Sequence, residues 1–100
     1  MITFRDNLYL SPSIKKADKI KWKIKTGRGQ FNVYLIAYNH DSRKLEFFHN
    51  GLLKQKALYN RDIDVVGLAT SDDECIDITG KILLETYEKT GVYDISGYLE

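Results

Sequence analysis

The stretch DIDVVGLATSDDEC, residues 62–75, decides the fold because an apolar run passes directly into the start of a helix. Residues 62–69 have the composition of a central strand, with valine, isoleucine and leucine side chains that suit a sheet. Ser71 is a good N-cap, and Glu74 follows it at the three-residue spacing of a capping box. These residues therefore predict a strand followed by a helix.

The predicted helix runs from Ser71 to about Lys89, and Gly91 is well placed to end it in a left-handed cap. Its apolar side chains fall within one half of the helical circumference, as in a helix that packs on a core. Gly80 inside the helix costs about 1 kcal/mol relative to alanine, which a close backbone contact with the sheet would justify. Residues 92–99 are apolar and partly alternating, which favours a terminal strand.

Toward the N-terminus, residues 19–25 (KIKWKIK) alternate strictly between lysine and apolar side chains. Successive side chains of a strand point to opposite faces. Ile20, Trp22 and Ile24 would therefore share one face, and the four lysines would share the other. The pattern predicts a half-buried strand.

A second strand is predicted over residues 31–38, which are rich in aromatic and β-branched side chains. The loop before it contains two glycines, so the two runs are interpreted as a β-hairpin with Arg28 at its tip. Alternation divides this second strand into two faces. One face carries Phe31, Val33, Leu35 and Ala37, and the other carries Asn32, Tyr34, Ile36 and Tyr38.

Residues 39–44 have the composition of a polar turn, whereas residues 45–59 fit two structures. Asn50-Gly51 has the chemistry of a tight hairpin turn. Apolar side chains at helical spacing, followed by good helix formers, lead us to favour a short helix or an irregular segment instead. Residues 1–14 are expected to form either an edge strand or a loosely docked arm.

Together these elements predict a single α+β domain over residues 1–100. Its small antiparallel or mixed sheet consists of a β-hairpin and one or two further strands, packed by one long C-terminal helix. A chain of 100 residues with 43% hydrophobic and 29% charged residues suits one globular domain. Cys75 cannot form an internal disulfide, and neither a signal peptide nor a membrane span is apparent, so we expect a cytoplasmic protein.

Charge is divided unevenly along the chain, although the net charge is only +1. Residues 1–59 carry 12 lysines and arginines against 4 acids, whereas residues 60–100 carry 3 against 10. The basic part of one copy could meet the acidic helix of another, or the two could neutralise each other within one fold. A homo-oligomer or another protein partner is therefore one hypothesis.

A set of short motifs in the basic run and the C-terminal half carries a family resemblance. The motifs are Lys21-Trp22-Lys23-Ile24, Val66-Gly67-Leu68-Ala69, Asp73-Glu74, Ile82, Glu85, Tyr87, Thr90-Gly91, Tyr93-Asp94-Ile95 and Tyr98-Leu99. On these residues the chain resembles a group of small bacterial proteins without an assigned activity. The resemblance covers roughly residues 19–99 and implies a single non-secreted domain, with no catalytic residues to carry over.

The candidate binding surface is built around the lysines of the first predicted strand. It consists of Lys19, Lys21, Lys23, Lys25, Arg28, Tyr34 and Tyr38. Lysines at alternate strand positions lie about 6.6–6.8 Å apart. That spacing is similar to the phosphate repeat of an extended single strand, and the tyrosines would offer stacking platforms. A solvated sheet face, or an edge that lysines protect from aggregation, explains the same residues without a ligand.

No catalytic, cofactor or metal site is predicted. His40-Asp41-Ser42 contains the residue types of a triad, but triads assemble from distant positions, so we interpret it as a polar turn. His40 and His49 match no standard metal-ligand spacing. Gly27-Arg28-Gly29 lacks the phosphate-loop pattern and is interpreted as a hairpin turn. Cys75 is interpreted as a small core residue, because the acids before it oppose thiolate formation.

The leading hypothesis is a non-catalytic binding or regulatory module that acts through protein–protein contacts and needs no cofactor. One alternative is a nucleic-acid-binding protein that uses the lysine-rich strand. Another is a small hydrolase built around His40 or His49. A membrane partner is not expected.

Overall fold

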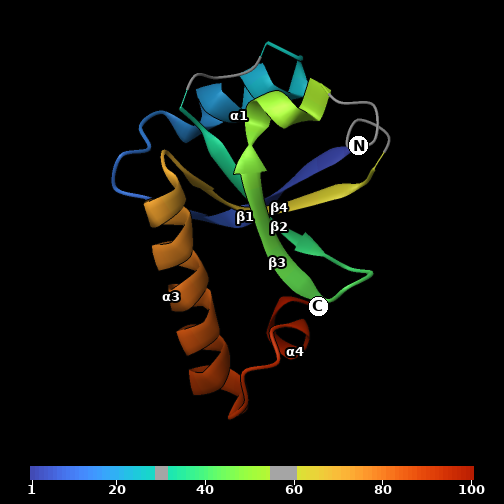
Figure 1. Cartoon of the computed structure of the whole chain (residues 1–100), viewed down its shortest axis with the longest axis vertical. Helices are drawn as coiled ribbons and strands as arrows, with labels where there is room; N and C mark the ends of the chain where they lie inside the picture. Colours follow the sequence, from blue (N-terminus) through green and yellow to red (C-terminus); the bar gives the residue numbers. More distant parts are fainter. Residues whose placement is uncertain (29–31, 55–60) are drawn as a thin grey trace.

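The computed structural model describes residues 1–28, 32–54 and 61–100, and its core is a four-stranded mixed sheet (Figure 1). The elements are β1 (Ile2–Leu10), α1 (Ala17–Lys25), β2 (Tyr34–Asn39), β3 (Lys44–His49), the 3-10 helix η1 (Asn50–Lys54), β4 (Ile63–Ala69), α3 (Asp72–Thr90) and α4 (Ser96–Leu99). The strand order is β1-β4-β2-β3, with β1 parallel to β4 and the other pairs antiparallel. The predicted single α+β domain with a long C-terminal helix is confirmed.

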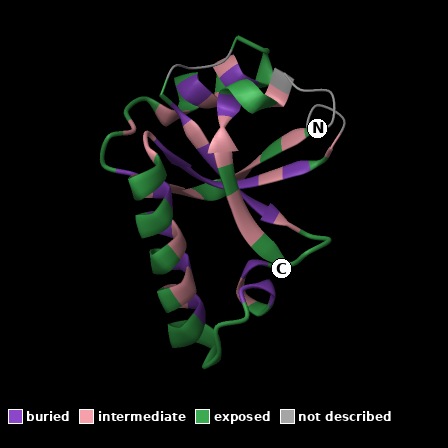
Figure 2. Ribbon diagram, in the orientation of Figure 1, coloured by how far each residue is buried: buried purple, intermediate pink, exposed green. Residues whose placement is uncertain are grey.

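Both faces of the sheet are covered by helices, so the molecule has two hydrophobic cores (Figures 1 and 2). Helices α3 and α4 cover one face, where Ile82 packs against Ile36 and Tyr38 of β2. Helix α1 covers the other face, where Ile20 packs with Leu35. Strand β2 therefore buries alternate side chains on opposite faces, as its sequence pattern predicts.

Helix α1 occupies the residues that were predicted to form the first strand of a hairpin, so that prediction is wrong. Ile20 and Ile24 are four residues apart, which places them on one side of a helix, where both are buried. Trp22 lies on the opposite side, with 52% of its surface exposed. A two-residue alternation of lysine and isoleucine is thus also compatible with a short amphipathic helix, and lysine is a good helix former.

The loop after α1 ends the helix and makes no hairpin turn. The N–H of Gly27 donates to the Ile24 carbonyl at 3.2 Å, and the N–H of Arg28 donates to the Lys23 carbonyl at 2.9 Å. Gly27 has a left-handed conformation with φ 77°. This combination is the Schellman cap, in which glycine is favoured because it tolerates positive φ.

The hairpin of this fold joins β2 to β3 through the predicted polar turn. Asn39 Oδ1 accepts hydrogen bonds from the backbone N–H groups of Asp41 and Ser42, at 2.9 and 3.1 Å. Residues 44–49 continue as a strand, so the favoured helix is wrong there, and Asn50-Gly51 opens η1 in place of a hairpin turn. Residues 55–60, the rest of that ambiguous segment, lie outside the described residues.

Helix α3 follows its prediction closely at both ends. Ser71 Oγ accepts the Glu74 N–H at 3.2 Å, and Gly91, with φ 79°, donates its N–H to the Tyr87 carbonyl at 2.8 Å. The expected contact between Gly80 and the sheet is wrong, because a side chain at that position would meet nothing within 4 Å. The predicted terminal strand over residues 92–99 is also wrong, since the chain folds back as the short helix α4.

Residues 1–14 were expected to form an edge strand or a loosely docked arm, and the structure shows the edge strand β1. Phe4 pairs with Val65, but the next register pair is Tyr9 with Gly67. The five-residue step on β1 therefore matches a two-residue step on β4, and the extra residues on β1 interrupt the pairing. Among the described residues, no helix is long and apolar enough to cross a membrane.

Candidate functional site

The lysines of the candidate binding surface lie around helix α1 and do not form a single row. At 100° per residue, Lys19 and Lys23 fall on one side of the buried isoleucines, and Lys21 and Lys25 fall on the other. Lys21 Nζ lies 3.2 Å from Asp18 Oδ1, and Lys25 Nζ lies 5.7 Å from the centre of the Phe4 ring. The cations therefore surround the exposed ridge of the helix.

The guanidinium group of Arg28, just past the helix, stacks over Trp22 at 4.9 Å from the ring centre. This cation–π contact fixes the indole at the outer surface of α1, in the middle of the lysines. The alternation in the sequence predicted that Trp22 would be buried on a strand. The helix instead turns it outward.

Tyr34 and Tyr38 belong to the opposite face of the sheet, so the structure does not bring them together with the lysines. Tyr38 is 2% exposed and donates its hydroxyl to Glu100 Oε2 at 2.7 Å. Burial and this hydrogen bond raise the pKa of Tyr38. Tyr34 packs on the α3 side and makes an edge contact with the His49 ring at 5.4 Å. Neither tyrosine can therefore stack on a base of a nucleic acid that is held by the α1 lysines. Ligand binding by those lysines stays a prediction.

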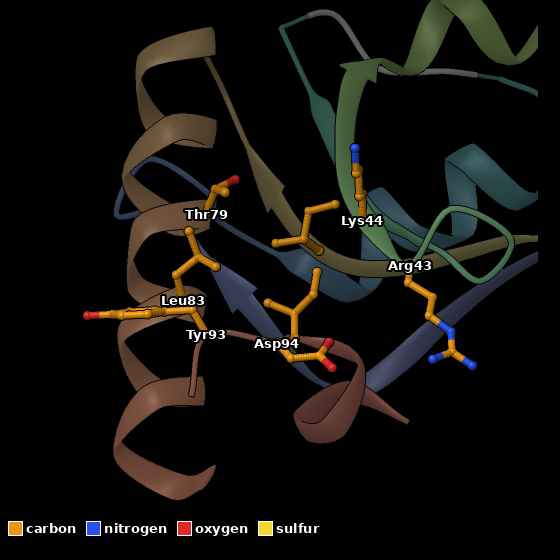
Figure 3. A pocket seen from close by; sticks show the side chains of 8 residues that line it. Arg43, Lys44, Thr79, Leu83, Tyr93 and Asp94 are labelled. Carbon is orange, nitrogen blue, oxygen red and sulfur yellow. The ribbon is translucent and has the colours of Figure 1, made fainter. Parts of the chain in front are cut away.

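A groove of about 300 Å³ runs between strand β3 and helix α3 (Figure 3). Its lining residues, called the β3 groove below, are Arg43, Lys44, Leu45, Thr79, Leu83, Tyr93, Asp94 and Ile95. Figure 3 shows Thr79 and Leu83 of α3 on one side, Arg43 and Lys44 on the other, and Asp94 at the end. The Tyr93 ring stacks on Tyr87 of α3, with ring centres 4.7 Å apart. The sequence interpretation missed this site, because it favoured a helix where β3 lies.

Strand β3 contributes an open edge to this groove. Within the described residues, its six residues pair only with β2, and no strand lies on the outer side. An antiparallel strand directs every second set of backbone N–H and C=O groups away from its partner. Leu45 and Phe47 point to the α3 side, opposite the buried β2 residues Tyr38 and Ile36, and Phe47 is 38% exposed. The groove thus combines free backbone groups with apolar side chains.

Charge at one end of the β3 groove is mainly positive. Asp94 accepts hydrogen bonds from the backbone N–H and hydroxyl of Ser96, at 3.1 and 2.6 Å, which lower its pKa. Its carboxylate is thus engaged by Ser96, the first residue of α4. Arg43 and Lys44 form no ion pair with any described carboxylate.

A second polar cluster joins β1, β4 and the end of β2. Arg5 Nε and Nη2 donate to the two oxygens of Asp64 at 2.9 and 2.7 Å, and His40 Nε2 lies 2.8 Å from Asp64 Oδ2. The hydrogen bonds from Arg5, reinforced by His40, lower the pKa of Asp64. The sequence interpretation missed this cluster, because Arg5 and Asp64 are far apart in the chain and nothing local links them.

The same cluster bears on the hydrolase alternative. A histidine does lie beside a carboxylate, but in the described part of the chain no hydroxyl or thiol hydrogen-bonds to His40. Both oxygens of Asp64 are occupied by Arg5. Cys75 is fully buried in the α3 core, and burial raises the pKa of its thiol to about 11. The arrangement is therefore suited to tying three strands together, and it lacks an activated nucleophile.

Hydroxyl groups at the start of α3 serve a structural purpose. Glu74 Oε1 accepts from the backbone N–H and hydroxyl of Thr70, at 2.8 and 2.6 Å, and Oε2 accepts from Ser13 Oγ at 2.8 Å. These bonds lower the pKa of Glu74 to about 2. They tie the segment after β1 to the segment after β4.

The residues that the structure describes contain no group of three or more histidine, cysteine, aspartate or glutamate side chains arranged to hold a metal ion. Comparisons of the chain with protein-family models, with curated proteins and with solved structures find no significant match.

Proposed function

We propose that this protein is a non-catalytic interaction module that binds an extended segment of a partner protein in the β3 groove. The observation that carries the proposal is the regular edge of β3, which no described strand covers, beside a partly apolar groove. Strand addition is a common way to bind peptides, because backbone hydrogen bonds supply affinity and side-chain pockets supply specificity.

The two edge strands of the sheet differ in a way that supports β3 as the docking edge. The register of β1 with β4 is interrupted after Phe4. Such an irregularity disfavours continuous pairing of a further strand along the β1 edge. Strand β3 keeps an unbroken register with β2 from Lys44 to His49. A sheet that leaves one edge regular and interrupts the other favours addition at the regular edge.

The chemistry of the groove specifies the segment that it would take. Residues at alternate positions of an added strand lie about 6.6 Å apart and face the same side. Apolar side chains at such positions would contact Leu45, Leu83 and Phe47. An acidic residue at the end of the segment would meet Lys44 and Arg43, which form no ion pair with a described carboxylate, although the charge of Arg43 acts on nearby Asp94. The expected ligand is an extended acidic–apolar peptide.

Selection from a phage library of random linear decapeptides tests this proposal. We expect enriched peptides with apolar residues at alternate positions and an acidic residue at one end. A synthetic version of an enriched peptide should slow amide hydrogen exchange in β3, which a ligand bound elsewhere would not do. Failure to enrich any peptide, or enriched peptides that leave β3 exchange unchanged, would overturn the proposal.

Two pairs of variants give the matched controls. Lys44→Glu should weaken binding of the acidic peptide, whereas Lys81→Glu should not, because Lys81 lies on the side of α3 that faces Tyr9, away from the groove. Leu83→Arg should block the groove, whereas Leu84→Arg alters an exposed neighbour on the same helix. Lys44 is exposed, so its reversal tests the groove even if Leu83→Arg fails to fold.

The cytoplasm is the setting that we propose for this interaction. The chain has one cysteine, which is buried, and it contributes no disulfide that would call for an oxidising compartment.

A further inference from the structure

We infer that the outer face of α1 is a binding surface for single-stranded nucleic acid, with Trp22 as the stacking platform and the surrounding cations as phosphate contacts. The cations, called the α1 basic face below, are Lys15, Lys16, Lys19, Lys23, Lys25 and Arg28. This inference is independent of the β3 groove, which lies on the opposite face of the sheet.

Local charge is the first support. Residues 15–28 contain seven lysines and arginines against Asp18 as the single acid. Within the described residues, only Lys21 of this set forms an ion pair, and it does so with Asp18. The acids of α3 form no ion pair with these cations in the described residues, although Glu74 reaches Ser13, two residues before Lys15, at 2.8 Å. The small net charge of the chain therefore conceals a strongly positive surface on one face.

The exposed tryptophan is the second support, and it selects the class of ligand. An acidic protein surface would bind through the cations alone. Contact with a half-exposed indole among the lysines would add little to its affinity. An unpaired base can stack on the indole while its phosphates meet the lysines. Lys19 and Lys23 are one helical turn apart, about 6 Å along the axis, so they can contact successive phosphates on one side of Trp22.

The Arg28 contact is the third support. Its guanidinium holds the indole in place before any ligand arrives, which limits the ordering cost of binding. Bases in duplex nucleic acid are already stacked on each other, so their faces are not available to Trp22. The surface should therefore prefer single strands to duplexes.

Trp22 is the chain's one tryptophan, so its fluorescence reports on this surface alone. Titration with oligothymidylate of 15 nucleotides at low salt should quench the emission and saturate. Binding that neutralises about five phosphates should weaken with salt, with a slope of log K against log salt near −3.5. A duplex of the same length should bind more weakly. The proposal fails if oligothymidylate leaves the emission unchanged, or if duplex and single strand bind equally.

Variants separate stacking from charge. Lys19→Gln with Lys23→Gln, which keeps good helix formers, should reduce the salt slope by about 1.4, whereas Lys44→Gln with Lys81→Gln should leave it unchanged. Trp22→Leu should weaken the binding of a labelled oligonucleotide about tenfold, the size of one base–aromatic stack. Equal affinity of wild type and Trp22→Leu would overturn the stacking role.

Two other anionic partners appear as distinct outcomes. If polyglutamate of matched charge displaces the oligonucleotide and gives the same quenching, the surface is a general acceptor of acidic chains and the inference is wrong. If light scattering detects a salt-sensitive dimer that excludes the oligonucleotide, α1 instead meets the acidic α3 of a second copy. Monomeric protein with quenching specific to single strands supports the inference.

Discussion

Replacement of Gly67 by alanine tests the close approach of β1 to β4. An alanine Cβ at this position would lie 2.9 Å from the Tyr9 carbonyl oxygen and 3.3 Å from Ile36 Cδ1. Carbon–oxygen contacts between strands are about 3.3 Å or longer, so β1 must move by about 0.4 Å or distort. The neighbour that must move is backbone, which cannot escape by a rotamer change.

The magnitude follows from two opposing effects. Overpacking of this kind costs about 1–3 kcal/mol. Alanine also restricts the unfolded chain, which offsets about 0.4–1 kcal/mol of that cost. We therefore expect Gly67→Ala to lower the free energy of unfolding by about 1–2 kcal/mol, and each kcal/mol corresponds to about 4–8 °C in the midpoint of thermal unfolding.

Gly80→Ala is the matched control, because the same substitution at an open helical position should have the opposite effect. Nothing lies within 4 Å of the new Cβ, and alanine is favoured over glycine inside helices by about 0.8–1 kcal/mol. Urea denaturation followed by circular dichroism measures both variants. If Gly67→Ala is as stable as the wild type, or as Gly80→Ala, the tight packing of β1 on Gly67 is refuted.

Three further predictions concern the interior of the fold. Asp64→Asn should lower the free energy of unfolding by about 2 kcal/mol at neutral pH, through loss of its charged hydrogen bonds to Arg5. Because the folded pKa of Asp64 lies below its ordinary value of 3.8, its stabilisation is present above that pH and is lost as the pH falls through the folded pKa. Wild type and Asp64→Asn should therefore converge in acid denaturation, and a constant difference down to pH 2 would contradict this. Cys75 should react with a disulfide reagent only as fast as the protein unfolds, so rapid labelling of the native protein would place the thiol outside the core. Ile82→Ala should cost about 2–5 kcal/mol in urea denaturation, and a loss below 1 kcal/mol would show that α3 does not pack there as described.

The second half of the fold was predictable because its signals are local. The cap at Ser71, the glycine at Gly91 and the apolar arc between them each have one interpretation, and each agrees with the others. Strand β4 was predictable because a run of β-branched residues ends directly at that cap. The division of β2 into two buried faces also follows from simple alternation.

The lysine-rich run could not be assigned correctly from its alternation alone. In KIKWKIK the two isoleucines lie four residues from each other and two residues from Trp22. A strand would therefore bury both isoleucines with Trp22, whereas a helix would bury the two isoleucines alone. Trp22 distinguishes the two, since a strand buries it with the isoleucines and a helix exposes it. Packing of Ile20 and Ile24 against one face of the sheet decides in favour of the helix.

The candidate sites depend on contacts that no local pattern contains. The β3 groove needs the strand after the polar turn, the middle of α3 and the segment that follows α3. Recognition of β3 in the sequence would have required the alternation of Leu45 and Phe47 to outweigh the helical spacing around them. The Arg5–Asp64–His40 cluster depends on the parallel pairing of β1 with β4, which is a property of the topology.

The parallel pairing of β1 and β4 also constrains the order in which the chain can fold during its synthesis. Ile2 pairs with Ile63, so β1 cannot pair with β4 until about sixty more residues have been synthesised. The β2–β3 hairpin, whose partners are adjacent in the chain, can form much earlier. Loop closure over such a separation is slow. During synthesis the apolar side chains of β1 therefore remain without their partner strand until β4 has been made.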